Sequence, residues 1–320
     1  MTRIVLLTCG LLAFLSLNMG GCDITITPIE TSADDVVDLT PADVTEVGTL
    51  TIDWANGTID IQVDETATAL SIEADRKVSG FSSISAEDAL LNWQIKVIVD
   101  DATPPNVSLK FNRPSNTLLY RANLTIVVPA TAGIVIDSNN GEIQVDGNDA
   151  DTKITLDNGD VTVINQNGKT TIETDNGEIE VNSLTGDVDA RTANGRITVD
   201  AAAGDVKAVT ENGRIVIDSA GGDVDARTSS GEIEISAQPG ENGAVEARSN
   251  FGRITLRVPA DFAADLTLET EFGAVDADLS DFDTADVQSS LRKLTAELNG
   301  GGGTILGRTD FGGVDFDSLP

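Results

Sequence analysis

The chain has 320 residues and carries 53 Asp and Glu against 20 Lys and Arg, a net charge of −33. Such a surface repels nucleic acid, so we expect no nucleic-acid partner. Histidine is absent and cysteine occurs twice, which excludes Ser–His and Cys–His hydrolase chemistry and any Cys-rich metal site. We therefore expect no cofactor.

The first 21 residues predict a lipoprotein signal peptide. Arg3 provides a positive start, residues 4–17 are apolar, and small residues precede Cys22. Residues 19–22 resemble a lipobox, so Cys22 is the expected lipidation site and its lipid the expected link to a membrane. The alternative is a buried cysteine behind an ordinary cleavage site. A transmembrane anchor is disfavoured because the apolar run is short of the roughly 20 residues that span a bilayer.

The next segment predicts a tether between the lipid and the folded part. Residues 22–47 contain Pro28, Pro41 and an acidic pair at residues 34–35. We expect one folded domain after it, residues 48–320.

Several elements precede the main repeat. An Asn-Gly turn at residues 56–57 leads into an alternating segment that ends at Ile61. Residues 86–91 predict a short helix that leads into a strand over residues 93–99. A further strand is expected at residues 124–129, which end in Val-Pro.

The central part of the chain repeats every 18 residues. The repeat is marked by glycines with Ile or Val two and four positions later: Gly141, Gly159, Gly177, Gly195, Gly213 and Gly231. The preceding residue is Asn, except at Ser230. Asn-Gly suits a tight turn, and alternating apolar residues predict a half-buried strand.

A second, weaker glycine column lies half a period away, so each period contains two strands. The pattern predicts an all-β, single-stranded β-solenoid with about 18 residues per coil. In the last repeats the spacing is longer, and Phe251, Phe272 and Phe311 replace the asparagine.

A hydroxyl residue stands three positions before the marker glycine in most repeats. Alternation with the apolar residues turns it inward, where its hydroxyl could hydrogen-bond along the stack. The residues of this column are Ser138, Thr174, Thr192, Thr210, Thr228, Ser249, Thr270 and Thr309, with Leu156 as the exception.

Over residues 48–317 this order of elements resembles the "putative adhesin" family of bacterial β-strand-repeat envelope proteins. The resemblance rests on the turn at 56–57, the helix and strand at 86–99, the Val-Pro strand at 124–129, and the Asn-Gly-x-Ile-x-Val coils. It implies a β-solenoid at the cell envelope. It supplies no catalytic residues.

Two sets of residues are candidates for chemistry. Asp187, Asp205 and Asp223 occupy one position in successive coils, where calcium could relieve their repulsion. The alternative is solvated carboxylates that splay apart. The three phenylalanines could form a platform for sugars, although plugging the solenoid end or packing under a longer loop is the favoured interpretation.

Opposite charges are also expected to stack across strands, as in two pairs: Glu178 with Arg196, and Arg214 with Glu232.

The favoured function is a non-catalytic envelope lipoprotein, a structural scaffold or adhesin that binds a glycan or an envelope or surface protein. We expect it at the bacterial cell envelope, lipid-anchored, either periplasmic or surface-exposed. The alternative is a binding module for cations or cationic peptides, whose binding would collapse in high salt. A polysaccharide-cleaving enzyme needs a walled groove around paired carboxylates, and central turns of two or three residues disfavour it.

Overall fold

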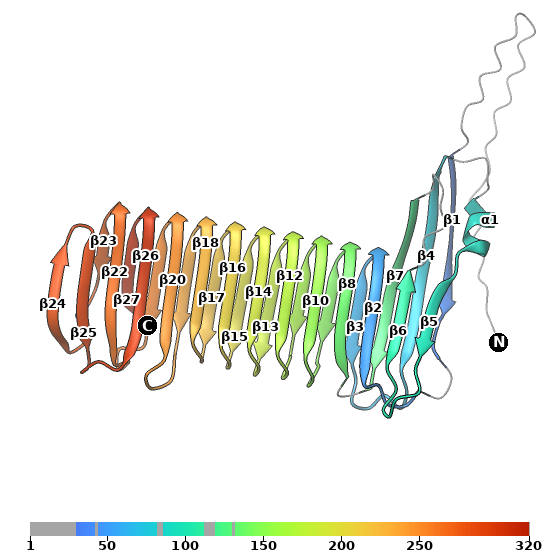
Figure 1. The fold of residues 1–320 in the computed structure, drawn as a ribbon, viewed down its shortest axis with the longest axis horizontal. Coiled ribbons are helices and arrows are strands. Elements are labelled where there is room, and N and C mark those ends of the chain that lie inside the picture. Colours follow the sequence, from blue (N-terminus) through green and yellow to red (C-terminus); the bar gives the residue numbers. More distant parts are fainter. Residues whose placement is uncertain (1–29, 42–43, 82–85, 112–118, 130–131, 320) are drawn as a thin grey trace, which may run out of the picture.

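The computed structural model describes residues 30–41, 44–81, 86–111, 119–129 and 132–319, and in them the chain forms a long rod of two facing sheets (Figure 1). The strands of both sheets lie across the rod axis. With strands about 4.8 Å apart, the stack is roughly 60 Å long.

Among the described residues the first sheet has 13 strands. In spatial order they are β1 (Glu30–Asp38), β4 (Ser71–Phe81), β7 (Leu119–Val128), β3 (Ile59–Val63), β9 (Ile143–Asp146), β11 (Val161–Ile164), β13 (Ile179–Leu184), β15 (Ile197–Ala202), β17 (Ile215–Ala220), β19 (Ile233–Ala237), β21 (Ile254–Val258), β27 (Val314–Ser318) and β23 (Val275–Ala277).

The second sheet has 14 strands in the same described part of the chain. In spatial order they are β24 (Thr284–Ser290), β25 (Lys293–Leu298), β22 (Ala264–Phe272), β26 (Gly303–Phe311), β20 (Ala244–Phe251), β18 (Val224–Ser230), β16 (Val206–Asn212), β14 (Val188–Asn194), β12 (Thr170–Asn176), β10 (Thr152–Asn158), β8 (Gly133–Asn140), β2 (Thr49–Asn56), β6 (Val107–Phe111) and β5 (Ile95–Val99). The helix α1 (Ala86–Asn92) packs against β1 and β4.

The central coils confirm the predicted solenoid and its period. Each coil places one strand in each sheet, and each strand pairs in parallel with its equivalent one coil later. In the first sheet, for example, Ile179 pairs with Ile197, and Ile197 with Ile215. The 18-residue period in the sequence is therefore the length of one coil.

The core is a thin layer between the sheets. Strand residues alternate between buried and outward-facing, so that Ile197 and Val199 of β15 are fully buried while Thr198 faces outward. Opposite them, the second sheet contributes small residues such as Ala190 and Ala208. Burying each Ile or Val contributes about 1.5–3 kcal/mol, and the repeat multiplies that contribution.

An antiparallel cap closes the end of the rod that carries β1. Strand β4 pairs antiparallel with both β1 and β7, and β5 pairs antiparallel with β6. Beneath them Trp93 packs edge-on against Phe111 and Tyr120. Arg76 forms an ion pair with Asp35 and lies over the Trp93 ring.

Strand order at the other end differs from chain order. Strands β26 and β27, which come last in the chain, lie between the coil of β20 and β21 and the strands β22 and β23 (Figure 1). Two antiparallel strands, β25 and then β24, complete the second sheet. The final coil is thus inserted into the stack.

One domain boundary needs correction. Residues 30–38 fall within the predicted tether, 22–47, but they form strand β1. The acidic residues of this strand do not prevent pairing, because Asp35 faces the buried Arg76. The short helix and the strands expected at 93–99 and 124–129 are confirmed as α1, β5 and β7.

The predicted signal peptide, 1–21, and Cys22 lie outside the described residues. Within the described part of the chain, no helix combines the length and apolar character needed to cross a bilayer.

Candidate binding surfaces

One corner of the rod is built by the marker glycines and the asparagines before them. The turn brings successive coils so close that a Cβ on Gly177 would lie 1.8 Å from the carbonyl oxygen of Gly159. Gly177 also has a φ of +154°, which side chains disfavour. The repeating glycine is therefore required by the stacking distance.

The asparagines form a continuous ladder along this corner. Each side-chain amide donates to the side-chain oxygen of the previous coil, over 3.0 Å from Asn176 to Asn158 and 3.1 Å from Asn194 to Asn176. The asparagine ladder consists of Asn56, Asn140, Asn158, Asn176, Asn194 and Asn212. Its polar groups are largely satisfied by one another.

The hydroxyl column behaves as predicted in most coils. Thr192 is buried and its hydroxyl donates to the Gly177 carbonyl over 3.3 Å. The same bond to a marker glycine is made by Thr210, Thr228, Ser249, Thr270 and Thr309. These bonds satisfy carbonyl groups that face the interior at the turn. The hydroxyls of Ser138 and Thr174 make no such bond in the described structure.

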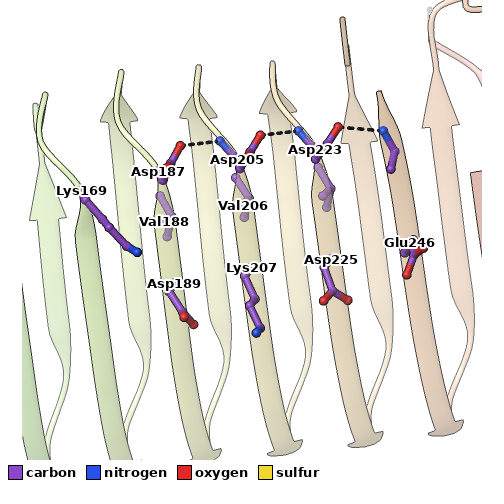
Figure 2. A pocket seen from close by; sticks show the side chains of 12 residues that line it. Lys169, Asp187, Val188, Asp189, Asp205, Val206, Lys207, Asp223, Asp225 and Glu246 are labelled. Carbon is purple, nitrogen blue, oxygen red and sulfur yellow. Dashed lines mark hydrogen bonds between the residues drawn. The ribbon is translucent and has the colours of Figure 1, made fainter. Parts of the chain in front are cut away.

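The aspartate row consists of Asp187, Asp205 and Asp223, and Figure 2 shows what it does. The Asp187 carboxylate accepts the backbone N–H of Asp205 over 3.1 Å, and the Asp205 carboxylate accepts that of Asp223 over 2.9 Å. Asp223 accepts the N–H of Ala244 over 2.8 Å. Each carboxylate therefore satisfies the first backbone amide of the next coil.

An open groove of ≈ 350 Å³ runs beside this row on the outer face of the second sheet. It is lined by the aspartate row, by further acidic residues at 189, 225 and 246, and by Lys169 and Lys207 (Figure 2). Three of the acids are paired within their own strands, Asp189 with Arg191, Asp225 with Arg227 and Glu246 with Arg248.

The aspartates lie in a line, one to a coil, and do not converge on one point. Among the described residues no group of three or more acidic, Cys or His side chains is arranged to hold a metal ion. The carboxylates of Asp187, Asp205 and Asp223 are bonded to backbone amides of the next coil, and calcium binding by them stays a prediction.

The outer face of the first sheet carries a charged cluster that the sequence did not reveal. Glu234 accepts hydrogen bonds from Arg257 over 2.9 Å and from Arg214 over 2.6 Å. These bonds, Arg257 first, hold the pKa of Glu234 below its usual value. Arg214 also lies 3.6 Å from Glu232, as expected, whereas no ion pair joins Glu178 to Arg196.

The corner column changes character toward the end of the rod. After Ser230 the position of the asparagine is taken by Phe251, Phe311 and Phe272, in that spatial order. Their rings stack with centroids 4.9 and 4.8 Å apart and planes within 7° and 8° of parallel. This phenylalanine stack is exposed, so, contrary to our expectation, the rings neither plug the rod end nor lie buried under a loop.

Sequence reasoning found the three phenylalanines and missed what surrounds them. It missed the insertion of β26, which sets the order of the rings. It also missed Arg292, whose guanidinium lies 5.8 Å from the centroid of Phe272. Arg292 belongs to the β24–β25 turn, where no repeat pattern marks its position.

Comparison with known proteins gives little further guidance. No family model and no curated protein matches the sequence. Two solved structures align with it. One is a "putative adhesin" from Bacteroides fragilis, 10% identical over 92% of this chain and 98% of its own, with a TM-score of 0.34.

The other is a "putative cell adhesion protein" from Clostridium sporogenes, 9% identical over 90% of this chain and 100% of its own, with a TM-score of 0.24. At such TM-scores neither structure carries an argument about this chain. The resemblance to the "putative adhesin" family stays a prediction.

Proposed function

We propose that this protein is a non-catalytic adhesin or scaffold of the bacterial cell envelope, held to a membrane by a lipid on Cys22. The observation that carries the proposal is the placement of the phenylalanine stack. It lies on the rod surface near the end opposite β1, and β1 is the described strand nearest to Cys22 in the chain (Figure 1). A rod tethered at Cys22 would hold the exposed rings away from the membrane.

The arrangement of the polar groups supports a binding role over catalysis. The asparagine ladder, the hydroxyl column and the aspartate row all bond along the stack. The groove beside the aspartate row is open, and its acidic residues are engaged with backbone amides or with arginines. The ladder, the column and the row hold the coils together, and the open groove lacks the water-excluding walls that acid–base chemistry uses.

Protease treatment of intact cells tests the location. If the protein is an adhesin on the cell surface, protease should remove it from intact cells. A Cys22→Ser variant should be released from the membrane fraction. Protection in intact cells, followed by digestion after lysis, would contradict surface adhesion and leave a periplasmic scaffold. Retention of the Cys22→Ser variant in the membrane would contradict the lipid anchor.

A second candidate is a module that binds cations or cationic peptides, and the acidic groove favours it. Charge-driven binding weakens steeply with salt because exposed charges are screened. The test is the binding of oligolysine to the purified protein at low salt and at about 0.5 M salt. Binding that is lost at 0.5 M salt favours the cation-binding module, since apolar contacts survive that salt concentration.

A further inference from the structure

The phenylalanine stack is an exposed apolar strip that the fold does not require. Phe251, Phe311 and Phe272 are 55%, 45% and 56% exposed and are the last residues of β20, β26 and β22. The same backbone position holds asparagine through the middle of the rod. Since a polar residue satisfies this corner in the same fold, the exposed rings point to an interaction surface.

The orientation of the rings decides what kind of partner they suit. Both faces of Phe311 are covered, by Phe251 and by Phe272. The guanidinium of Arg292 lies over the Phe272 ring, 5.8 Å from its centroid, at cation–π distance. Sugars pack against open ring faces, whereas this stack presents mainly ring edges. The strip therefore suits apolar protein side chains better than a glycan.

One ring face is left without a stacked partner in the described structure. Phe251 is paired in register with Ser230 on its other side, and the serine side chain is too short to cover the ring. The opposite end of the stack shows which group such a face accepts, since Arg292 lies over Phe272 at 5.8 Å. A guanidinium on the free face of Phe251 would repeat that cation–π contact.

Charge also selects the partner. Glu271 and Asp310 directly precede two of the rings, and the whole chain has a net charge of −33. Arg253 is the first positively charged residue after Phe251, and it is paired with Asp315 over 3.0 Å. A second copy of this chain would bring the same strong negative charge, so long-range repulsion disfavours self-association through this strip.

We propose that the phenylalanine stack docks an arginine-bearing, apolar segment of a partner protein. One arginine of the segment stacks on the free face of Phe251, and its apolar side chains lie along the edges of Phe311 and Phe272. This rests on the proposed adhesive function and names the partner class, a basic protein segment and not a glycan.

The test uses the purified full-length protein and fluorescent peptides of alternating Arg and Leu, with Lys–Leu, Arg–Ser and Glu–Leu peptides as comparisons. The central variant is Phe251→Asn with Phe272→Asn and Phe311→Asn, which places at this corner, beyond Ser230, the residue that the same fold carries in the middle of the rod. The matched control replaces Asn158, Asn176 and Asn194 by Ser at the same corner. Circular dichroism and thermal melting confirm that each variant is folded.

We expect the Arg–Leu peptide to bind the wild type and the control alike, and to lose about tenfold or more in affinity on the triple Asn variant. Phe251→Asn alone should abolish the preference for Arg–Leu over Lys–Leu. Unchanged affinity on the triple variant would overturn the proposal. So would stack-dependent binding of chitin or β-glucan oligosaccharides, or stack-dependent dimerisation, in place of peptide binding.

This experiment is independent of where the protein resides. Failure of peptide binding would remove the partner class and leave the envelope location intact. Protection from protease on intact cells would remove surface adhesion and leave the peptide result standing.

Discussion

The middle of the rod and its far end use the same corner for different purposes. From β8 to β18 the coils repeat every 18 residues and the corner carries the asparagine ladder. From β20 to β27 the coils are longer, one is inserted, and the corner carries stacked phenylalanines. Both regions keep the close-packed glycine and the buried hydroxyl behind it. The backbone stack depends on the glycine and the hydroxyl, which leaves the outward side chain free to vary.

The strongest test of that division concerns the glycine. Gly177→Ala places a Cβ 1.8 Å from the Gly159 carbonyl oxygen, and we expect it to lower the free energy of unfolding by about 3 kcal/mol or more. Gly240→Ala is the matched control, because no atom lies within 4 Å of its Cβ. Urea denaturation followed by circular dichroism measures both, and equal midpoints would contradict the stacking argument.

The aspartate row gives the next largest effect. Asp205→Ala leaves the backbone N–H of Asp223 without its 2.9 Å acceptor, and we expect a loss of about 1 kcal/mol. Asp205→Asn retains a side-chain oxygen and should lose much less. If the two variants melt at the same temperature, the row has no role in joining the coils.

Exchange of residues between the two regions probes the corner itself. Asn176→Phe breaks the amide bonds to Asn158 and Asn194 and should cost about 1 kcal/mol. Replacing Asn158, Asn176 and Asn194 together by Phe should cost less than three times that amount, because neighbouring rings regain about 0.5–1.5 kcal/mol per stacked pair. A multiple-mutant cycle measures the coupling. Strictly additive losses would mean that the column does not support stacking in the middle of the rod.

The smallest effect concerns acid stability. The pKa of Glu234 is lowered in the folded protein, first by the hydrogen bond from Arg257. A lowered folded pKa stabilises the protein above the unfolded pKa of about 4.3, and this contribution is lost as the pH falls through the folded pKa.

Wild type should therefore exceed Glu234→Gln in stability at pH 7 by less than about 1 kcal/mol, since the pair is partly exposed. Denaturation series at pH 7 and at about pH 3 measure that difference, which should shrink in acid. A difference that grows in acid would contradict the lowered pKa of Glu234.

The sequence predicted the repeating part well because one period controls it. Once Gly177 and its equivalents are spaced by 18 residues, turn, strand and inward face follow in every coil. The hydroxyl column could also be placed, because alternation fixes which side Thr192 faces.

The ends were harder because they do not repeat. The tether assignment failed for residues 30–38. This segment pairs with β4, and Asp35 contacts Arg76, and both partners lie far away in the sequence. The insertion of β26 also depends on long-range pairing, so chain order alone gives the wrong neighbour for Phe251. Arg292 was missed for the same reason, and with it the cation–π contact on Phe272.

The inserted coil is the central claim, because it builds the phenylalanine stack. Disulfide formation tests it directly in two double variants, Phe251→Cys with Phe311→Cys and Phe251→Cys with Phe272→Cys. Positions 251 and 311 are direct partners in parallel strands, within reach of a disulfide, whereas β26 separates 251 from 272. Mild oxidation and peptide mapping should show the 251–311 bond form readily and the 251–272 bond fail to form. A 251–272 bond in folded protein, with none between 251 and 311, would contradict the insertion and the binding surface built on it.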